Sequence, residues 1–180
     1  MYGGHVTPLL AAHGIATVVN LRGENPKSTW YSPERAACEG LEIGYLDRPL
    51  HSRRLPKKQM LIDLLDAFET APRPLLIKCS GGADRTALAA AIYILHRDGL
   101  DGIADARRQM AVIPYLHLPK RYQRWIRSFP RYFEADHGGL TITDWARSRY
   151  RPEAFADWLD QKGLDGTWRR QRGNVVRTIL

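Results

Sequence analysis

One segment constrains the fold of this chain more than any other: an apolar run that leads through a lysine into a cysteine. Leu75–Ile77 is short and wholly apolar, as in a strand at the centre of a parallel sheet. After Cys79 come five small or polar residues, then Arg85 and an alanine-rich stretch with the composition of a helix. A strand, loop and helix in this order predict an α/β fold with the loop at a helix N-terminus.

The remainder of the first half supports this prediction, because helical and extended patterns alternate along it. Such alternation indicates a mostly parallel sheet flanked by helices. We expect strands over residues 15–21, 41–47 and 75–77, and helices over 7–13, 32–40 and 57–70.

The second half has no strong strand pattern and is expected to be helical. We expect helices over 101–111, 119–136, 143–150 and 152–162, with Pro130 breaking the second of them. We interpret residues 1–180 as one domain, with a core over about 6–135 and a helical C-terminal extension over about 136–180. The tail from Asp165 is basic and is expected to be irregular.

Several classes of protein are excluded by composition. The longest apolar stretch, Ala87–Leu95, is about half the length of roughly 20 residues that a membrane span needs, so no transmembrane segment is expected. Two cysteines cannot form a secreted disulfide scaffold, and the N-terminus lacks the pattern of a signal peptide, so we expect a cytoplasmic location. The histidines and cysteines lack metal-ligand spacing, and neither a metal nor another cofactor is expected.

The charge of the chain favours anionic partners. Its net charge is +8, and 21 of its 27 basic residues are arginines, which bind planar oxyanions through two hydrogen bonds. The expected partners are a phosphorylated protein, a phosphorylated small molecule or a lipid headgroup; solubility alone also explains such a surface. Nucleic acid is not expected, because the aromatic residues at 122, 125, 132 and 133 have the helical spacing typical of a core. The oligomeric state is left open.

The loop after Cys79 has the composition of an anion cradle. Backbone N–H groups at a helix N-terminus point at a bound anion, and Gly81 and Gly82 allow successive amides to converge. Arg85 could close the ring through a bidentate contact. Amides, a guanidinium and a helix N-terminus all stabilise a thiolate, so Cys79 is a candidate nucleophile. The residues expected to contact the anion are Ser80, Gly81, Gly82 and Ala83.

With Cys79, five intervening residues, Arg85 and Thr86 after an apolar strand, the chain resembles the cysteine-dependent protein tyrosine phosphatase superfamily, in particular its small dual-specificity-like and bacterial branches. The resemblance covers roughly residues 6–135. It implies a hydrolase that forms a phosphocysteine intermediate on Cys79 without a metal, with Arg85 binding the phosphate and Thr86 donating to the sulfur. It implies phosphotyrosine or dual-specificity protein substrates, with a phosphoinositide or inositol phosphate as the alternative.

Two carboxylates compete for the role of the general acid. Asp47 ends the second expected strand, where small dual-specificity-like members carry their acid. Asp84 directly precedes Arg85, where some lipid-directed relatives carry theirs. Arg22, at the exit of the first expected strand, is a further candidate for substrate binding. Lys78 stands where the superfamily usually has a histidine that orders the loop, which leaves a phosphate-binding module with little turnover as another alternative.

Overall fold

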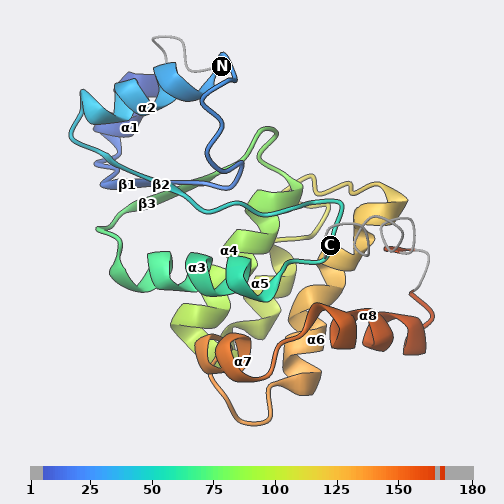
Figure 1. Cartoon of the computed structure of the whole chain (residues 1–180). Helices are drawn as coiled ribbons and strands as arrows, with labels where there is room; N and C mark the ends of the chain where they lie inside the picture. Colours follow the sequence, from blue (N-terminus) through green and yellow to red (C-terminus); the bar gives the residue numbers. More distant parts are fainter. Residues whose placement is uncertain (1–5, 165–166, 169–180) are drawn as a thin grey trace.

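A three-stranded parallel sheet forms the centre of the chain, as the computed structural model of residues 6–164 and 167–168 shows (Figure 1). Its strands are β1 (Thr17–Asn20), β2 (Gly44–Asp47) and β3 (Leu75–Lys78), in the order β2-β1-β3. The predicted α/β class with a parallel sheet is therefore confirmed. The second strand is shorter than predicted because residues 41–43 form the turn that closes the preceding helix, with Glu42 at a φ of 58°.

The three strands end level with one another. Asn20, the last residue of β1, is in register with Asp47 on one side and with Lys78 on the other. Because parallel strands run in the same direction, the segments that follow all three emerge at one edge of the sheet. This edge gathers the loops that form the candidate site.

Helices cover both faces of the sheet (Figure 1). Val18 packs in a small cluster with Leu10 and Cys38 beneath α1 and α2, and its neighbour Val19 faces the main core beneath α3 and α4. This alternation is the period of two that a strand covered on both faces requires. The first four helices are α1 (Val6–Ala12), α2 (Tyr31–Glu39), α3 (Lys58–Thr70) and α4 (Asp84–Asp98).

The predicted helices of the second half exist but are divided differently. The segment predicted as one helix over 101–111 is a 3-10 turn, η1 (Gly99–Gly102), followed by α5 (Ile103–Arg108). The segment predicted over 119–136 is η2 (Arg121–Ser128) and α6 (Phe129–Asp136). Pro130 occupies the first turn of α6, where its missing N–H costs no helical hydrogen bond, so the break predicted there is confirmed.

Two further helices, α7 (Ile142–Ser148) and α8 (Pro152–Gln161), pack against the main core. Arg147 pairs with Asp66 of α3 at 2.6 Å, and the buried Tyr150 hydroxyl donates to the carbonyl of Pro56 at 2.7 Å. The tail from Asp165 that the sequence marks as basic lies outside the described residues, apart from Thr167 and Trp168. Among the described residues, no helix has the length and apolarity needed to cross a membrane.

Candidate active site

The loop between β3 and α4 brings Cys79 and Arg85 together. Gly82 has a φ of 65°, a backbone conformation that residues with a Cβ rarely adopt, and it turns the chain directly into the first turn of α4. Arg85 folds back across the loop, where it donates to the Ser80 hydroxyl at 2.7 Å and approaches the Leu21 carbonyl at 3.4 Å. The Arg85 guanidinium is therefore fixed beside the loop by contacts with two different segments, the loop itself and the residue that follows β1.

The surroundings of Cys79 favour its thiolate. Burial alone would raise the pKa of this thiol, but four groups lower it: the Thr86 hydroxyl at 3.2 Å, the N–H groups of Gly81 and Gly82, and the charge of Arg85. The net result is a Cys79 pKa below its ordinary value. A lowered pKa means that the thiolate forms at lower pH than on an ordinary cysteine.

The two cysteines should therefore differ in reactivity. Cys38 is 2% exposed, and burial raises its pKa. In the folded protein at about pH 7, iodoacetamide should label Cys79 at least about ten times faster than Cys38. Because the Thr86 hydroxyl lowers the pKa of Cys79, Thr86→Ala should move the pH dependence of labelling to higher pH. Peptide mass mapping across a pH series measures both effects; an unmoved profile in Thr86→Ala would contradict the role given to that hydroxyl.

Lys78 does not point toward the cleft. Its ammonium forms a buried ion pair with Glu34 of α2, on the opposite face of the sheet from the main core, and lies 4.9 Å from the centre of the Trp30 ring. Tyr45 donates to the same Glu34 oxygen at 2.9 Å, and burial together with this bond raises the Tyr45 pKa. Lys78 thus stabilises the end of β3 on the α2 side of the sheet, while Thr86 and the loop amides contact the sulfur.

Removing one partner of this pair should be costly, because the other charge stays buried. Glu34 is 1% exposed and Lys78 is 7% exposed. Glu34→Gln should lower the free energy of unfolding by about 3 kcal/mol, and Glu34→Gln combined with Lys78→Met should recover much of that loss. Urea unfolding measures both. Glu39→Gln, which removes an exposed pair with Arg35, is the matched control and should cost about 0.5 kcal/mol or less; an equal loss in both single variants would contradict this account.

A cleft of about 590 Å³ opens above the loop. One wall is the segment after β2, which contributes His51, Arg53 and Arg54, and Gln123 of η2 contributes to another side. Burial and the nearby charges of Arg54, Lys57 and Arg85 lower the pKa of His51. The predicted site residues that line this cleft are Cys79, Ser80, Gly81, Ala83, Asp84 and Arg85.

The two candidate acids occupy different surroundings. Asp84 lines the cleft, and its two oxygens contact His117 Nε2 at 3.1 Å and Gln123 Nε2 at 2.6 Å. Asp47 is not among the residues that line the cleft, and its oxygens accept from Asn20 at 2.7 Å and from the Tyr31 hydroxyl at 2.5 Å.

Arg22 also lies away from the cleft lining. Its guanidinium stacks on the Trp30 ring at 3.3 Å, and its backbone N–H donates to the Asn20 side chain at 3.1 Å. The structure therefore brings Cys79, Ser80, Asp84 and Arg85 together, and places Arg22 and Asp47 beside them on the α2 side.

His117 is a functional candidate that sequence reasoning missed. Its Nδ1 lies 3.2 Å from the Met110 carbonyl, and because a carbonyl can only accept, Nδ1 carries a hydrogen. The hydrogen bond between His117 Nε2 and the Asp84 carboxyl group then needs one proton, carried either by Nε2 or by the carboxyl oxygen. The Gln123 amide is oriented in turn, because its oxygen accepts from the Lys120 N–H at 3.2 Å. Neither residue belongs to a recognisable motif, and both lie more than thirty positions after Asp84, so no local signal could have found them.

Within residues 6–164 and 167–168, no group of three or more His, Cys, Asp or Glu side chains is placed to hold a metal ion. The fold and this site define an α/β protein with a glycine-containing loop between a parallel strand and a helix, centred on a cysteine with a lowered pKa.

No protein-family model and no curated protein matches the sequence. Among solved structures, the chain is similar to TpbA of P. aeruginosa over 92% of its own length and 80% of that chain, with 22% sequence identity and a TM-score of 0.47. At this identity and TM-score, the likeness does not define the activity of the chain.

Proposed function

We propose that this protein is a phosphate monoester hydrolase that works through a phosphocysteine intermediate on Cys79. One observation carries the proposal: the thiol with a lowered pKa lies in a loop whose amides and arginine surround it, at the floor of a cleft. A phosphate seated there would place its phosphorus near the sulfur and its oxygens near the amides and Arg85. Preorganised donors of this kind supply most of the catalysis in phosphoryl transfer.

The first step is a displacement at phosphorus. The Cys79 thiolate attacks, an S–P bond forms, and the bond from phosphorus to the leaving oxygen breaks. That oxygen takes a proton from Asp84, whose carboxyl group faces the cleft beside the cradle. Asp84 is proposed over Asp47 because Asp84 lines the cleft that holds Cys79 and Arg85, whereas Asp47 does not.

Water completes the cycle in the second step. Asp84, now a carboxylate, takes a proton from the water as the water oxygen attacks phosphorus, and the S–P bond breaks to release orthophosphate and the thiolate. Thr86 donates to the sulfur and so stabilises the charge that returns to it. His117 and Gln123 fix the Asp84 carboxyl group, and are positioning residues in this scheme.

The covalent intermediate is the decisive test. The protein is mixed with p-nitrophenyl phosphate, quenched in acid within milliseconds, and digested. We expect a burst of p-nitrophenol and a Cys79 peptide heavier by one phosphoryl group. Steady turnover with phosphate on another residue, or with none on any residue, would overturn the proposal. A folded protein that binds phosphate but gives neither burst nor turnover would favour the binding-module alternative.

A further inference from the structure

The segment between α5 and η2 exposes apolar side chains to an unusual degree. Five of the large exposed apolar residues lie within residues 112–118; their exposed fractions are Val112 43%, Ile113 81%, Tyr115 48%, Leu116 71% and Leu118 71%. The others, Leu9, Leu100 and Leu140, lie singly on other parts of the described chain. Scattered apolar residues are ordinary on a protein surface, but a contiguous group of this kind marks an interaction site.

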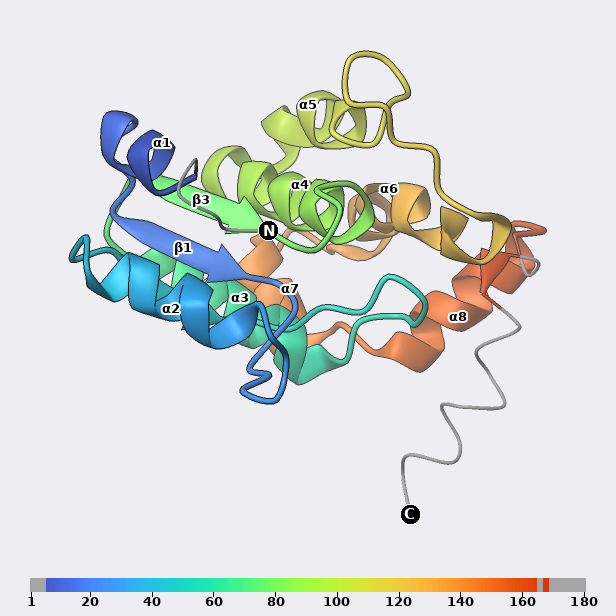
Figure 2. The same ribbon diagram turned by 90° about the horizontal axis from the view of Figure 1, so that it is seen from above.

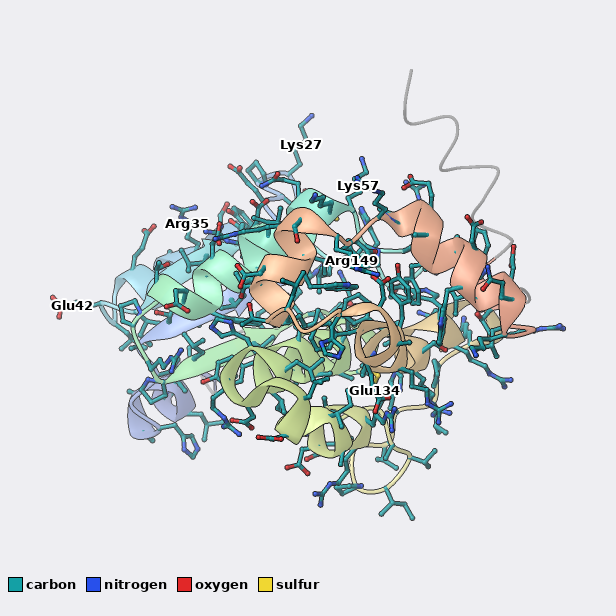
Figure 3. The ribbon with its side chains drawn as sticks, turned by 90° about the horizontal axis from the view of Figure 1, so that it is seen from below. Lys27, Arg35, Glu42, Lys57, Glu134 and Arg149 are labelled. Carbon is teal, nitrogen blue, oxygen red and sulfur yellow. The ribbon has the colours of Figure 1, made fainter. Side chains whose placement is uncertain are left out.

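The segment is a closed loop with a fixed base. The Leu116 N–H donates to the Val112 carbonyl at 2.7 Å, and the His117 N–H donates to the Ala111 carbonyl at 3.2 Å. His117 itself is 1% exposed and contacts Asp84, while the guanidinium of Arg127 donates to the His117 carbonyl. In Figures 2 and 3 the loop, drawn in yellow after α5, stands out at the rim of the molecule. The apolar side chains of the loop thus face solvent, while His117 at the end of the loop contacts Asp84 of the candidate active site.

The surroundings of this loop are strongly basic. Residues 106–133 contain seven arginines and lysines and no aspartate or glutamate. The acidic residues nearest to this stretch each pair with one of its arginines: Asp105 pairs with Arg108, and Glu134 of α6, labelled in Figure 3, pairs with Arg107. Arg124 and Lys120 are exposed beside the loop.

A second hollow lies next to the base of the loop. It measures about 370 Å³, and Met110 at the start of the loop contributes to its lining. Four arginines from three elements share this lining: Arg107, Arg124, Arg127 and Arg131. A hollow of this composition suits an anionic headgroup, because guanidinium groups bind phosphate oxygens through paired hydrogen bonds.

We propose that the loop over residues 112–118 and the arginines around it form a docking surface for an anionic phospholipid bilayer. The bilayer interface offers what the two features need together: an apolar layer for the loop and negative headgroups for the arginines. A protein partner would have to supply both an apolar socket and a dense anionic rim. Because His117 joins the loop to Asp84, docking would hold the catalytic cleft beside the bilayer surface.

The test is sedimentation of the full chain with vesicles, carried out in the Cys79→Ser background so that it does not depend on turnover. Vesicles of phosphatidylcholine alone are compared with vesicles of equal parts phosphatidylcholine and phosphatidylglycerol. We expect binding to the anionic vesicles only, weakened at least about tenfold when salt rises from about 50 to about 500 mM. Ile113→Ser combined with Leu116→Ser should weaken binding about tenfold, since two aliphatic side chains lose their burial. Arg124→Gln combined with Arg131→Gln should weaken it several-fold.

Leu9→Ser combined with Leu140→Ser is the matched control, because both leucines are exposed but lie outside the loop. This variant should leave vesicle binding unchanged. Circular dichroism and thermal unfolding establish that each variant is folded. Absence of binding to the anionic vesicles, or binding to them that the loop variant leaves intact, overturns the proposal. So does concentration-dependent self-association abolished by the loop variant, which would show that a second copy of the chain covers the loop. If the protein proves to have no phosphatase activity, the result of this binding test still stands, because sedimentation does not depend on turnover.

Discussion

Cys79→Ser should reduce the hydrolysis of p-nitrophenyl phosphate at least about a thousandfold, which in practice means to the background rate. A serine hydroxyl at this position stays protonated near neutral pH, so the groups that stabilise a thiolate would have no anion to act on. The loop amides and Arg85 remain in place, because the side chains differ by one atom. The variant should therefore keep its affinity for orthophosphate, measured by calorimetry, while it loses turnover.

Cys38→Ser is the matched control for this experiment. Cys38 packs with Leu10, Val18 and Ile43 on the α2 side of the sheet, away from the cleft. A buried hydroxyl there should cost about 1 kcal/mol of stability, measured by urea unfolding, and should leave kcat within about twofold. Turnover that survives in Cys79→Ser would show that the active site lies elsewhere.

The fold was largely predictable because it rests on local patterns. The alternation of apolar strands and amphipathic helices predicts the parallel sheet, and Pro130 predicts a break between two helices. The bounds were less predictable. Residues 41–43 have strand-like composition, but Ile43 turns back to bond the Cys38 carbonyl, and the helix end they close outweighs their β propensity. Residues 99–108 became a 3-10 turn and a short helix, a division that no cap residue in the sequence marks.

The arrangement of the candidate site was predictable only where its residues are contiguous. The cradle from Cys79 to Thr86 is one strand–loop–helix unit, so its residues are brought together by local geometry. The long-range partners were not accessible in the same way. The pairing of Lys78 with Glu34 spans 44 positions, and it depends on α2 covering one face of the sheet. The contact of Asp84 with His117 spans 33 positions, and it depends on the path of the loop after α5.

The assignment of the general acid predicts a selective loss with poor leaving groups. Asp84→Asn should lower kcat/KM for phenyl phosphate about a hundredfold, because phenolate leaves slowly unless its oxygen is protonated. With p-nitrophenyl phosphate, whose leaving group is stable as an anion, the loss should be about tenfold or less. Initial rates with both substrates at concentrations well below KM give kcat/KM, and so this ratio, directly.

Two further variants decide what the ratio means. Asp47→Asn should change both rates by about the same small factor, because Asp47 does not line the cleft in which the leaving group would lie. If Asp47→Asn instead shows the selective loss and Asp84→Asn does not, Asp47 is the acid and the carboxylate beside Arg85 only orients the loop. His117→Asn keeps a hydrogen-bonding side chain but cannot share the proton at Asp84. Its loss should therefore be selective for phenyl phosphate and smaller than that of Asp84→Asn, whereas a purely structural histidine would lower both rates equally.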